Sequence, residues 1–124
     1  SASPTPPSCA AALAALDILE DRPGLVDKLI SNSDKMRDGF EEMGFKIMKS
    51  STAIVPVIVG DMEKAFIFWR KLFDLGVFVN AFVPPGVPPN MSMMRTSYMA
   101  SHEDVHLEKI LDVFKEVGKK LKLI

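Results

Sequence analysis

Residues 90–102 read NMSMMRTSYMASH, and this stretch decides how the predicted fold is arranged. Its central part is predicted to be the last strand of the chain. Because side chains alternate across a strand, Arg95 lies on the same side as Met93, and Thr96 and Tyr98 lie opposite. An arginine that only solubilises a surface does not need such apolar company, so the stretch raises the question of what Arg95 binds.

Outward from this stretch, the sequence predicts further strands and a closing helix. Strands are predicted over residues 45–48, 54–59, 77–82 and 93–99. Pro56 cannot donate to a ladder, which places its strand at an edge or at a bulge. Ser101, followed three residues later by Asp104, resembles a capping box. The helix it starts has an apolar side formed by Val105, Leu107, Ile110, Leu111, Phe114 and Val117.

Between the strands, residues 61–75 are predicted to form a helix capped by Asp61. Its buried stripe is predicted from apolar residues at spacings of three and four, namely Phe66, Trp69, Leu72 and Phe73. Residues 83–90, VPPGVPPN, hold four of the nine prolines, too many for a ladder, so this segment is predicted to be an ordered loop.

The amino-terminal third predicts two helices. Thr5 can cap the first, and Pro6 occupies a position where its missing N–H costs nothing. The second begins near Pro23 and stops at Gly44. Its apolar side is formed by Leu25, Leu29, Met36, Phe40 and Met43.

Two helices followed by β-β-α-β-loop-β-α predict an α/β fold. More closely, they predict an α+β two-layer sandwich, in which helices pack against a small, mainly antiparallel sheet. The length of 124 residues suits one domain with a sizeable core.

Composition excludes several classes of function. The 15 basic and 16 acidic residues give a net charge of -1, so there is no electrostatic reason to expect nucleic acid or a membrane as a partner. The single cysteine rules out an internal disulfide and favours a reducing, cytoplasmic location. No Cys/His cluster predicts a metal site, and no catalytic set of residues can be identified.

Arg95 is the first candidate for binding, with two interpretations open. Its planar guanidinium can hold a carboxylate bidentately, a pairing that strengthens where water is excluded. Alternatively, Arg95 extends from the sheet to pair with an acid on a neighbouring helix.

Other reactive side chains favour structural interpretations. His102 is predicted to make a structural hydrogen bond to a nearby carbonyl, and His106 to be solvated on its helix. Cys9 has alanines around it and no basic neighbour, so we expect an inert, buried thiol. The amino-terminal SASPTPP either caps the first helix or binds an anion at its free N–H groups.

Several stretches, taken in order, resemble the carboxy-terminal part of the α-oxoamine synthases. They are SASPTPPSCAAALAALDIL, STAIVPVIVGD, GVFVNAFVPPGVPP and MMRTSYMASHEDVHLEKILDVF, and together they cover essentially the whole chain. These synthases are pyridoxal-phosphate (PLP) enzymes of the aspartate-aminotransferase fold. They include glycine C-acetyltransferase (2-amino-3-ketobutyrate CoA ligase), 8-amino-7-oxononanoate synthase, serine palmitoyltransferase and 5-aminolevulinate synthase.

The resemblance implies roles for particular residues. Arg95 matches the family's strand arginine that holds the carboxylate of the substrate amino acid. Ser1, and less directly Ser3, match a segment that reaches the cofactor phosphate of the neighbouring subunit. His102 matches a family histidine that we interpret as structural.

The chain also departs from the family pattern. Met93 replaces the first arginine of an Arg-x-Arg pair, and Thr5 replaces the first of two prolines. The family's Schiff-base lysine lies upstream of these motifs, and no lysine here has its setting. We therefore expect a fragment that contains no catalytic residue and is inactive alone.

As the resemblance implies, residues 1–43 are expected to link an absent large PLP domain to the small carboxy-terminal domain of residues 44–124. The complete protein is expected to be a homodimer that condenses an amino acid, such as glycine or serine, with an acyl-CoA. Two alternatives stay open: the carboxy-terminal domain of a PLP-dependent aminotransferase, and a non-enzymatic α/β binding domain.

Overall fold

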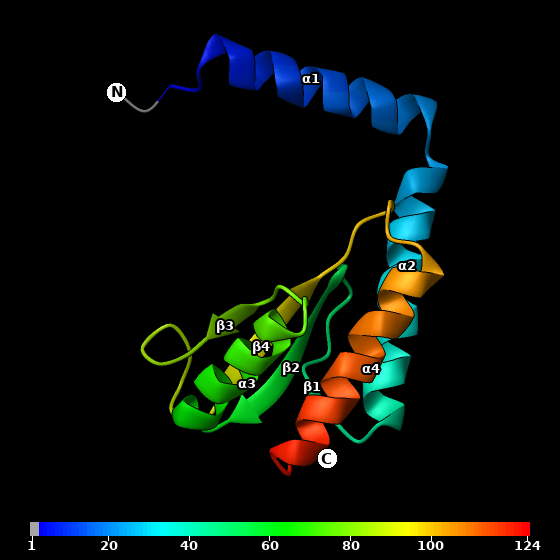
Figure 1. Ribbon diagram of the computed structural model, residues 1–124. Helices are drawn as coiled ribbons and strands as arrows, with labels where there is room; N and C mark the ends of the chain where they lie inside the picture. The colour runs from blue at the N-terminus through cyan, green and yellow to red at the C-terminus, as the bar shows by residue number, and fades with distance from the viewer. Residues whose placement is uncertain (1–2) are drawn as a thin grey trace.

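The computed structural model describes residues 3–124, whose helices and strands follow the predicted order (Figure 1). Gly44, directly after the second helix, has a φ of 93°, the left-handed conformation that glycine adopts without strain. The elements are α1 (Pro6–Asp21), α2 (Gly24–Glu42), β1 (Lys46–Ile47), β2 (Ile54–Gly60), α3 (Met62–Asp74), β3 (Asn80–Phe82), β4 (Ser92–Ser97) and α4 (Asp104–Lys120).

The four strands form one antiparallel sheet in the order β1-β2-β4-β3, with α2, α3 and α4 packed on it (Figure 1). This confirms the predicted α+β two-layer sandwich. The predicted strand over residues 77–82 begins only at Asn80. Two contacts explain the late start: the Val77 N–H donates to the Leu72 carbonyl at 2.8 Å, and the Trp69 indole donates to the Val79 carbonyl at 3.0 Å.

The strand of Pro56 was predicted to lie at an edge or to carry a bulge; it is not an edge strand, but it does carry a bulge. β2 lies between β1 and β4, and the bulge in the β2–β4 pairing falls between Ile58 and Gly60. The carbonyl of Pro56 accepts from the N–H of Met48 at 3.0 Å, just beyond the end of β1. In an antiparallel pair the nitrogen and the carbonyl of one residue point to the same neighbouring strand, so the Pro56 nitrogen also faces the residue that follows β1. The missing N–H therefore removes no hydrogen bond from the paired residues of β1 and β2.

An aromatic cluster fills the layer between the helices and the sheet. Phe40, Phe68 and Phe114 come from α2, α3 and α4, and Phe45 directly precedes β1; their neighbouring rings have centroids 4.8–6.2 Å apart. All four side chains are buried. Burial of a phenylalanine side chain contributes about 1.5–3 kcal/mol, so this cluster holds the three helices on one sheet face.

The buried stripe of α3 differs from the predicted one. Leu72 is buried as predicted, but its buried companions are Ala65 and Phe68, whereas Phe66 and Phe73 are each 48% exposed. Both sets have helical spacing, and the helix presents the face that carries Phe68 to the aromatic cluster.

The start of α4 was also predicted incorrectly. Its N-cap is Glu103, and the Glu103 N–H donates to Nδ1 of His106 at 3.1 Å. Ser101 and Asp104 therefore do not form a capping box. Val105 is 63% exposed, and Val113 takes part in the core instead.

Helix α1 extends away from the sheet and its covering helices (Figure 1). It buries none of its residues, although it begins at Pro6 as predicted. Thr5 occupies the N-cap position, but its side chain makes no capping hydrogen bond. The large apolar side chains of α1, namely Leu13, Leu16, Ile18 and Leu19, are all exposed. α2 by contrast buries Met36 and Phe40 in the common core. The boundary placed at residue 44 stays a prediction.

Gly118→Ala is predicted to destabilise the 124-residue chain. An added Cβ would lie 2.5 Å from the Phe45 ring, which is packed in the aromatic cluster. Overpacking costs about 1–3 kcal/mol, which outweighs the gain of up to about 1 kcal/mol in helix propensity. We expect a net loss of about 1–2 kcal/mol, measured by urea denaturation.

Gly24→Ala is the matched control, because no heavy atom lies within 4 Å of its added Cβ. It should leave the free energy of unfolding unchanged or raise it slightly. Equal stability of Gly118→Ala and Gly24→Ala would show that the aromatic cluster is not tightly packed.

Candidate functional site

Arg95 lies on the face of the sheet opposite the helices. In β4, Met94 and Thr96 are buried toward the core, and Arg95 alternates with them. Its cross-strand partners are Pro56 in β2 and Asn80 in β3. The predicted alternation is therefore confirmed, and the arginine stands on the face that α2, α3 and α4 leave uncovered.

The guanidinium of Arg95 packs on an aromatic ring. Its central carbon lies 4.8 Å from the centre of the Phe82 ring, which belongs to the neighbouring strand β3. Phe82 pairs with Met93, so it is the diagonal neighbour of Arg95 on the same face. The attraction between a cation and a ring face orients the planar group.

Arg95 has unused capacity to bind. Its Nε is buried and has no hydrogen-bond partner within the described residues. No carboxylate of residues 3–124 pairs with it, since the ion pairs of this part involve other cations. The alternative in which a neighbouring helix supplies an acid to Arg95 is therefore not what the structure shows. A half-buried guanidinium with a free donor is suited to an added carboxylate.

On the helix side of β4, two buried hydroxyl groups are satisfied by hydrogen bonds within the protein. The Tyr98 hydroxyl donates to the Thr96 hydroxyl at 2.8 Å, and Thr96 donates to the Val55 carbonyl at 2.8 Å. Burial raises the pKa of Tyr98 above its ordinary value, and the bond to Thr96 opposes this only in part. These two groups stabilise the fold in their neutral forms.

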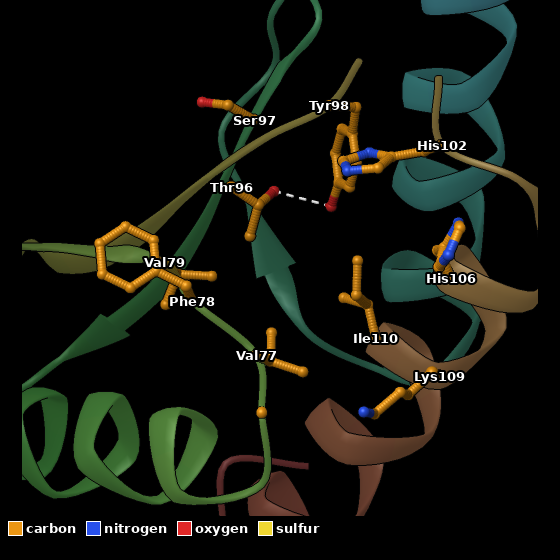
Figure 2. Close-up of a pocket in the computed structure, with 11 residues that line it drawn as sticks. Val77, Phe78, Val79, Thr96, Ser97, Tyr98, His102, His106, Lys109 and Ile110 are labelled. Carbon is orange, nitrogen blue, oxygen red and sulfur yellow. Dashed lines mark hydrogen bonds between the residues drawn. The ribbon is translucent and has the colours of Figure 1, made fainter. Parts of the chain in front are cut away.

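A pocket of about 440 Å³ opens beside these hydrogen bonds (Figure 2). It lies between β4, α4 and the segment before β3. Figure 2 shows Thr96, Tyr98, Ile110 and Lys109 around it. Arg95 is not part of its lining. Since Tyr98 and Thr96 are committed to these hydrogen bonds, we place the candidate site at Arg95 rather than here.

The turn after β4 is fixed from α2. The buried Asn32 side chain donates to the carbonyls of Met99 and His102 at 3.0 and 3.1 Å. Nδ1 of His102 accepts from the Met99 N–H at 3.3 Å, which agrees with a structural role, although its partner is an N–H rather than a carbonyl. His106 is exposed as predicted and in addition caps α4.

Phe82 and Asn32 were missed from the sequence. Phe82 becomes visible as a partner of Arg95 only once β3 is known to pair with β4. Asn32 is a polar residue on the apolar side of a helix, next to the equally buried Ser33, a weak signal that could mark it as buried.

Of the amino-terminal candidates, Ser3 lies ahead of α1 and Cys9 lies on it, and this helix extends away from the sheet (Figure 1). Ser1 falls outside the described residues, and Ser3 is exposed ahead of α1. Cys9 is exposed, not buried as expected, because α1 buries no residue. No group of three or more His, Cys, Asp or Glu in the described part of the chain could hold a metal ion. No helix among residues 3–124 is long and apolar enough to cross a membrane.

Comparison with known proteins places the chain. The profile of the family described as aminotransferase class I and II matches residues 1–114, nearly the whole sequence. The chain belongs to this family. The sequence resemblance is thereby confirmed, since the relatives include enzymes named serine palmitoyltransferase and 8-amino-7-oxononanoate synthase.

Two curated relatives show how much of a longer protein is matched. A serine palmitoyltransferase of Bacteriovorax stolpii is 40% identical over 119 residues, which are 96% of this chain and 28% of the relative. An 8-amino-7-oxononanoate synthase of Thermoanaerobacter pseudethanolicus is 40% identical over 119 residues, 96% of this chain and 30% of the relative. The chain thus spans about three-tenths of the length of these relatives.

Solved structures share the fold. A high-resolution structure of SPT with a PLP internal aldimine is 31% identical, with a TM-score of 0.76 over 79% of this chain and 25% of that one. Serine palmitoyltransferase of Sphingomonas wittichii is 34% identical, with a TM-score of 0.75 over the same shares, 79% and 25%. The described fold is that of the small carboxy-terminal domain of fold-type I PLP-dependent transferases.

The raised pKa of Tyr98 predicts a loss of stability in alkali. An unfolded tyrosine ionises near pH 10.0, whereas the buried one stays neutral to higher pH. The stabilisation is therefore fully present below pH 10.0 and is lost as pH rises through the folded-state pKa. Urea denaturation against pH should show this loss for the wild-type chain and not for Tyr98→Phe.

At neutral pH, Tyr98→Phe should lower the free energy of unfolding by about 1 kcal/mol, because Thr96 loses its donor. Tyr98 is the only tyrosine, so tyrosinate absorbance reports on it alone. Ionisation near pH 10.0 with the fold intact would contradict the buried hydrogen bonds of Tyr98 and Thr96.

Proposed function

We propose that the chain is the carboxy-terminal domain of a PLP-dependent enzyme that joins an amino acid to the acyl group of an acyl-CoA. Arg95 binds the α-carboxylate of that amino acid. The observation that carries the proposal is the guanidinium on the uncovered sheet face, whose buried Nε has no hydrogen-bond partner among residues 3–124. The names of the relatives support this class of reaction.

The cofactor would be held mainly by residues outside residues 1–124. When bound, PLP stores the electrons released at the α-carbon of the substrate. Among the described residues, Arg95 can bind the carboxylate of a substrate that lies beside the cofactor. It does not attach the cofactor covalently. We propose that the lysine that bears PLP lies in a segment absent from this chain, so the chain alone is inactive.

The part played by Arg95 is to position the substrate. A bidentate contact fixes the carboxylate, and this in turn orients the bonds at the α-carbon relative to the cofactor ring. Phe82, Pro56 and the buried Met93 surround the arginine on the uncovered face, which limits competition from water. Met93 takes the place of the first arginine of the family's Arg-x-Arg pair, so Arg95 is the one arginine on this strand.

Further partners follow from the exposed surfaces. We propose that a large domain covers the apolar residues of α1, with residues 1–43 as the link and residues 44–124 as the small domain. Ser1 and Ser3 would contact the cofactor phosphate of the second subunit of a homodimer. A cytoplasmic location stays a prediction from the cysteine content.

Two substrate pairs are proposed for testing: glycine with acetyl-CoA, as for a 2-amino-3-ketobutyrate CoA ligase, and serine with a long-chain acyl-CoA. The names of the relatives favour an acyl-CoA enzyme. An aminotransferase is the second candidate, since the matching profile spans aminotransferases of class I and II. Release of free CoA from an acyl-CoA in the presence of the amino acid separates the two.

Arg95→Ala, made in the full-length protein that carries this chain, tests the proposal. Loss of a charge-assisted, bidentate contact costs about 2–3 kcal/mol, so the dissociation constant for the amino acid should rise about 30- to 150-fold. Cofactor absorbance during titration with glycine, alanine or serine measures it. The amino acid that binds most tightly to the wild type becomes the leading substrate.

Arg70→Ala is the control, because Arg70 also lies near an aromatic ring, 5.9 Å from the centre of Phe73, but is exposed and paired with Asp74. It should bind the amino acid like the wild type. If Arg95→Ala also titrates like the wild type, Arg95 is a structural arginine and the proposed role is wrong.

A further inference from the structure

We infer that Phe82 is a positioning residue for the carboxylate site, holding the guanidinium of Arg95 in the orientation that binds the amino acid. The inference rests on the proposed function of Arg95. It assigns a specific role to a side chain on a different strand, which acts through its contact with Arg95.

The geometry of the two strands brings the groups together. Asn80 is opposite Arg95, and Phe82 is opposite Met93, so Phe82 is offset by two residues from Arg95 on the same face. A diagonal pair of this kind is within reach of an aromatic ring and a long side chain. The guanidinium carbon lies 4.8 Å from the ring centre, well inside the range of a cation–π interaction.

The Phe82 ring also restricts the flexibility of the Arg95 side chain. An arginine side chain is long and flexible, and its ordering on binding opposes affinity. No ion pair or side-chain hydrogen bond to another described residue holds Arg95 in place. Contact with Phe82 is the one oriented interaction found for its guanidinium within residues 3–124, and it leaves the N–H donors at the edge of the plane free.

Phe82 is itself held firmly enough to serve as a platform. It is half-buried at the end of β3, and the loop that follows is closed by a hydrogen bond from the Gly86 N–H to the Val83 carbonyl at 3.0 Å. A ring fixed by strand pairing and a closed loop orients the arginine before substrate arrives. Preorganisation of this kind increases affinity by reducing the ordering that binding requires.

The test uses Phe82→Leu in the full-length, cofactor-loaded protein. Leucine keeps an apolar side chain and removes the ring face. The dissociation constant for the tightest-binding amino acid, measured by calorimetry, should rise about three- to tenfold, the range of a partly desolvated cation–π interaction. Methylamine, which has the amine but no carboxylate, should bind Phe82→Leu and wild type equally.

Two further variants separate positioning from packing. Phe82→Trp retains a ring face and should restore the affinity for the amino acid to near the wild-type value. Phe66→Leu makes the same chemical change in another phenylalanine of the groove that Phe82 lines, and it should leave affinity unchanged. Equal losses in Phe82→Leu and Phe82→Trp, or a loss for methylamine as well, would overturn the inference.

A double-mutant cycle distinguishes this inference from the proposed function. With Arg95→Ala in place, Phe82→Leu should add no further loss, since the ring then has no guanidinium to orient. If Arg95→Ala weakens binding and Phe82→Leu does not, only the role of Phe82 is wrong. If Arg95→Ala itself has no effect, the proposed function fails, and the inference fails with it.

Discussion

The two-residue period of β4 is the constraint on which the rest of the structure depends. Met94, Thr96 and Tyr98 face the helices, and Arg95 faces the opposite way. A register slip of one residue would exchange the two faces. Arg95 would then enter a layer built from aromatic rings, where an unpaired charge costs several kcal/mol. The hydrogen bonds from Tyr98 to Thr96 and from Thr96 to Val55 support the observed register.

One-sided coverage of the sheet gives the arginine its environment. Because α2, α3 and α4 all pack on one face, β2 and β3 present Pro56 and Phe82 around Arg95 on the other (Figure 1). The apolar company noted in the sequence therefore divides in two. Met94 and Tyr98 belong to the core, whereas Met93 lies on the face of Arg95. Phe82, which is distant in the sequence, is the residue that contacts the guanidinium.

The start of α1 and the end of α2 were predicted correctly because they depend on residues at those ends themselves. Pro6 begins α1 because proline fixes its own φ, and Gly44 follows the end of α2 because glycine adopts the left-handed conformation without strain. Local rules of this kind failed where two local solutions compete. The set of Phe66 and Phe73 and the set of Phe68 and Leu72 both have helical spacing, and only contact with Phe114 and Phe45 selects the second.

The sequence by itself determined the order and type of the elements, the two faces of β4 and the choice of Arg95 as a candidate, because each depends on residues close together in the chain. Only the tertiary structure decided which strands are neighbours. It therefore decided that Pro56 lies inside the sheet at the point where β1 ends, that Asn32 holds the turn after β4, and that Phe82 meets Arg95. These contacts join residues far apart in the sequence, and their positions are fixed by burial of the shared aromatic core, to which every packed element contributes at once.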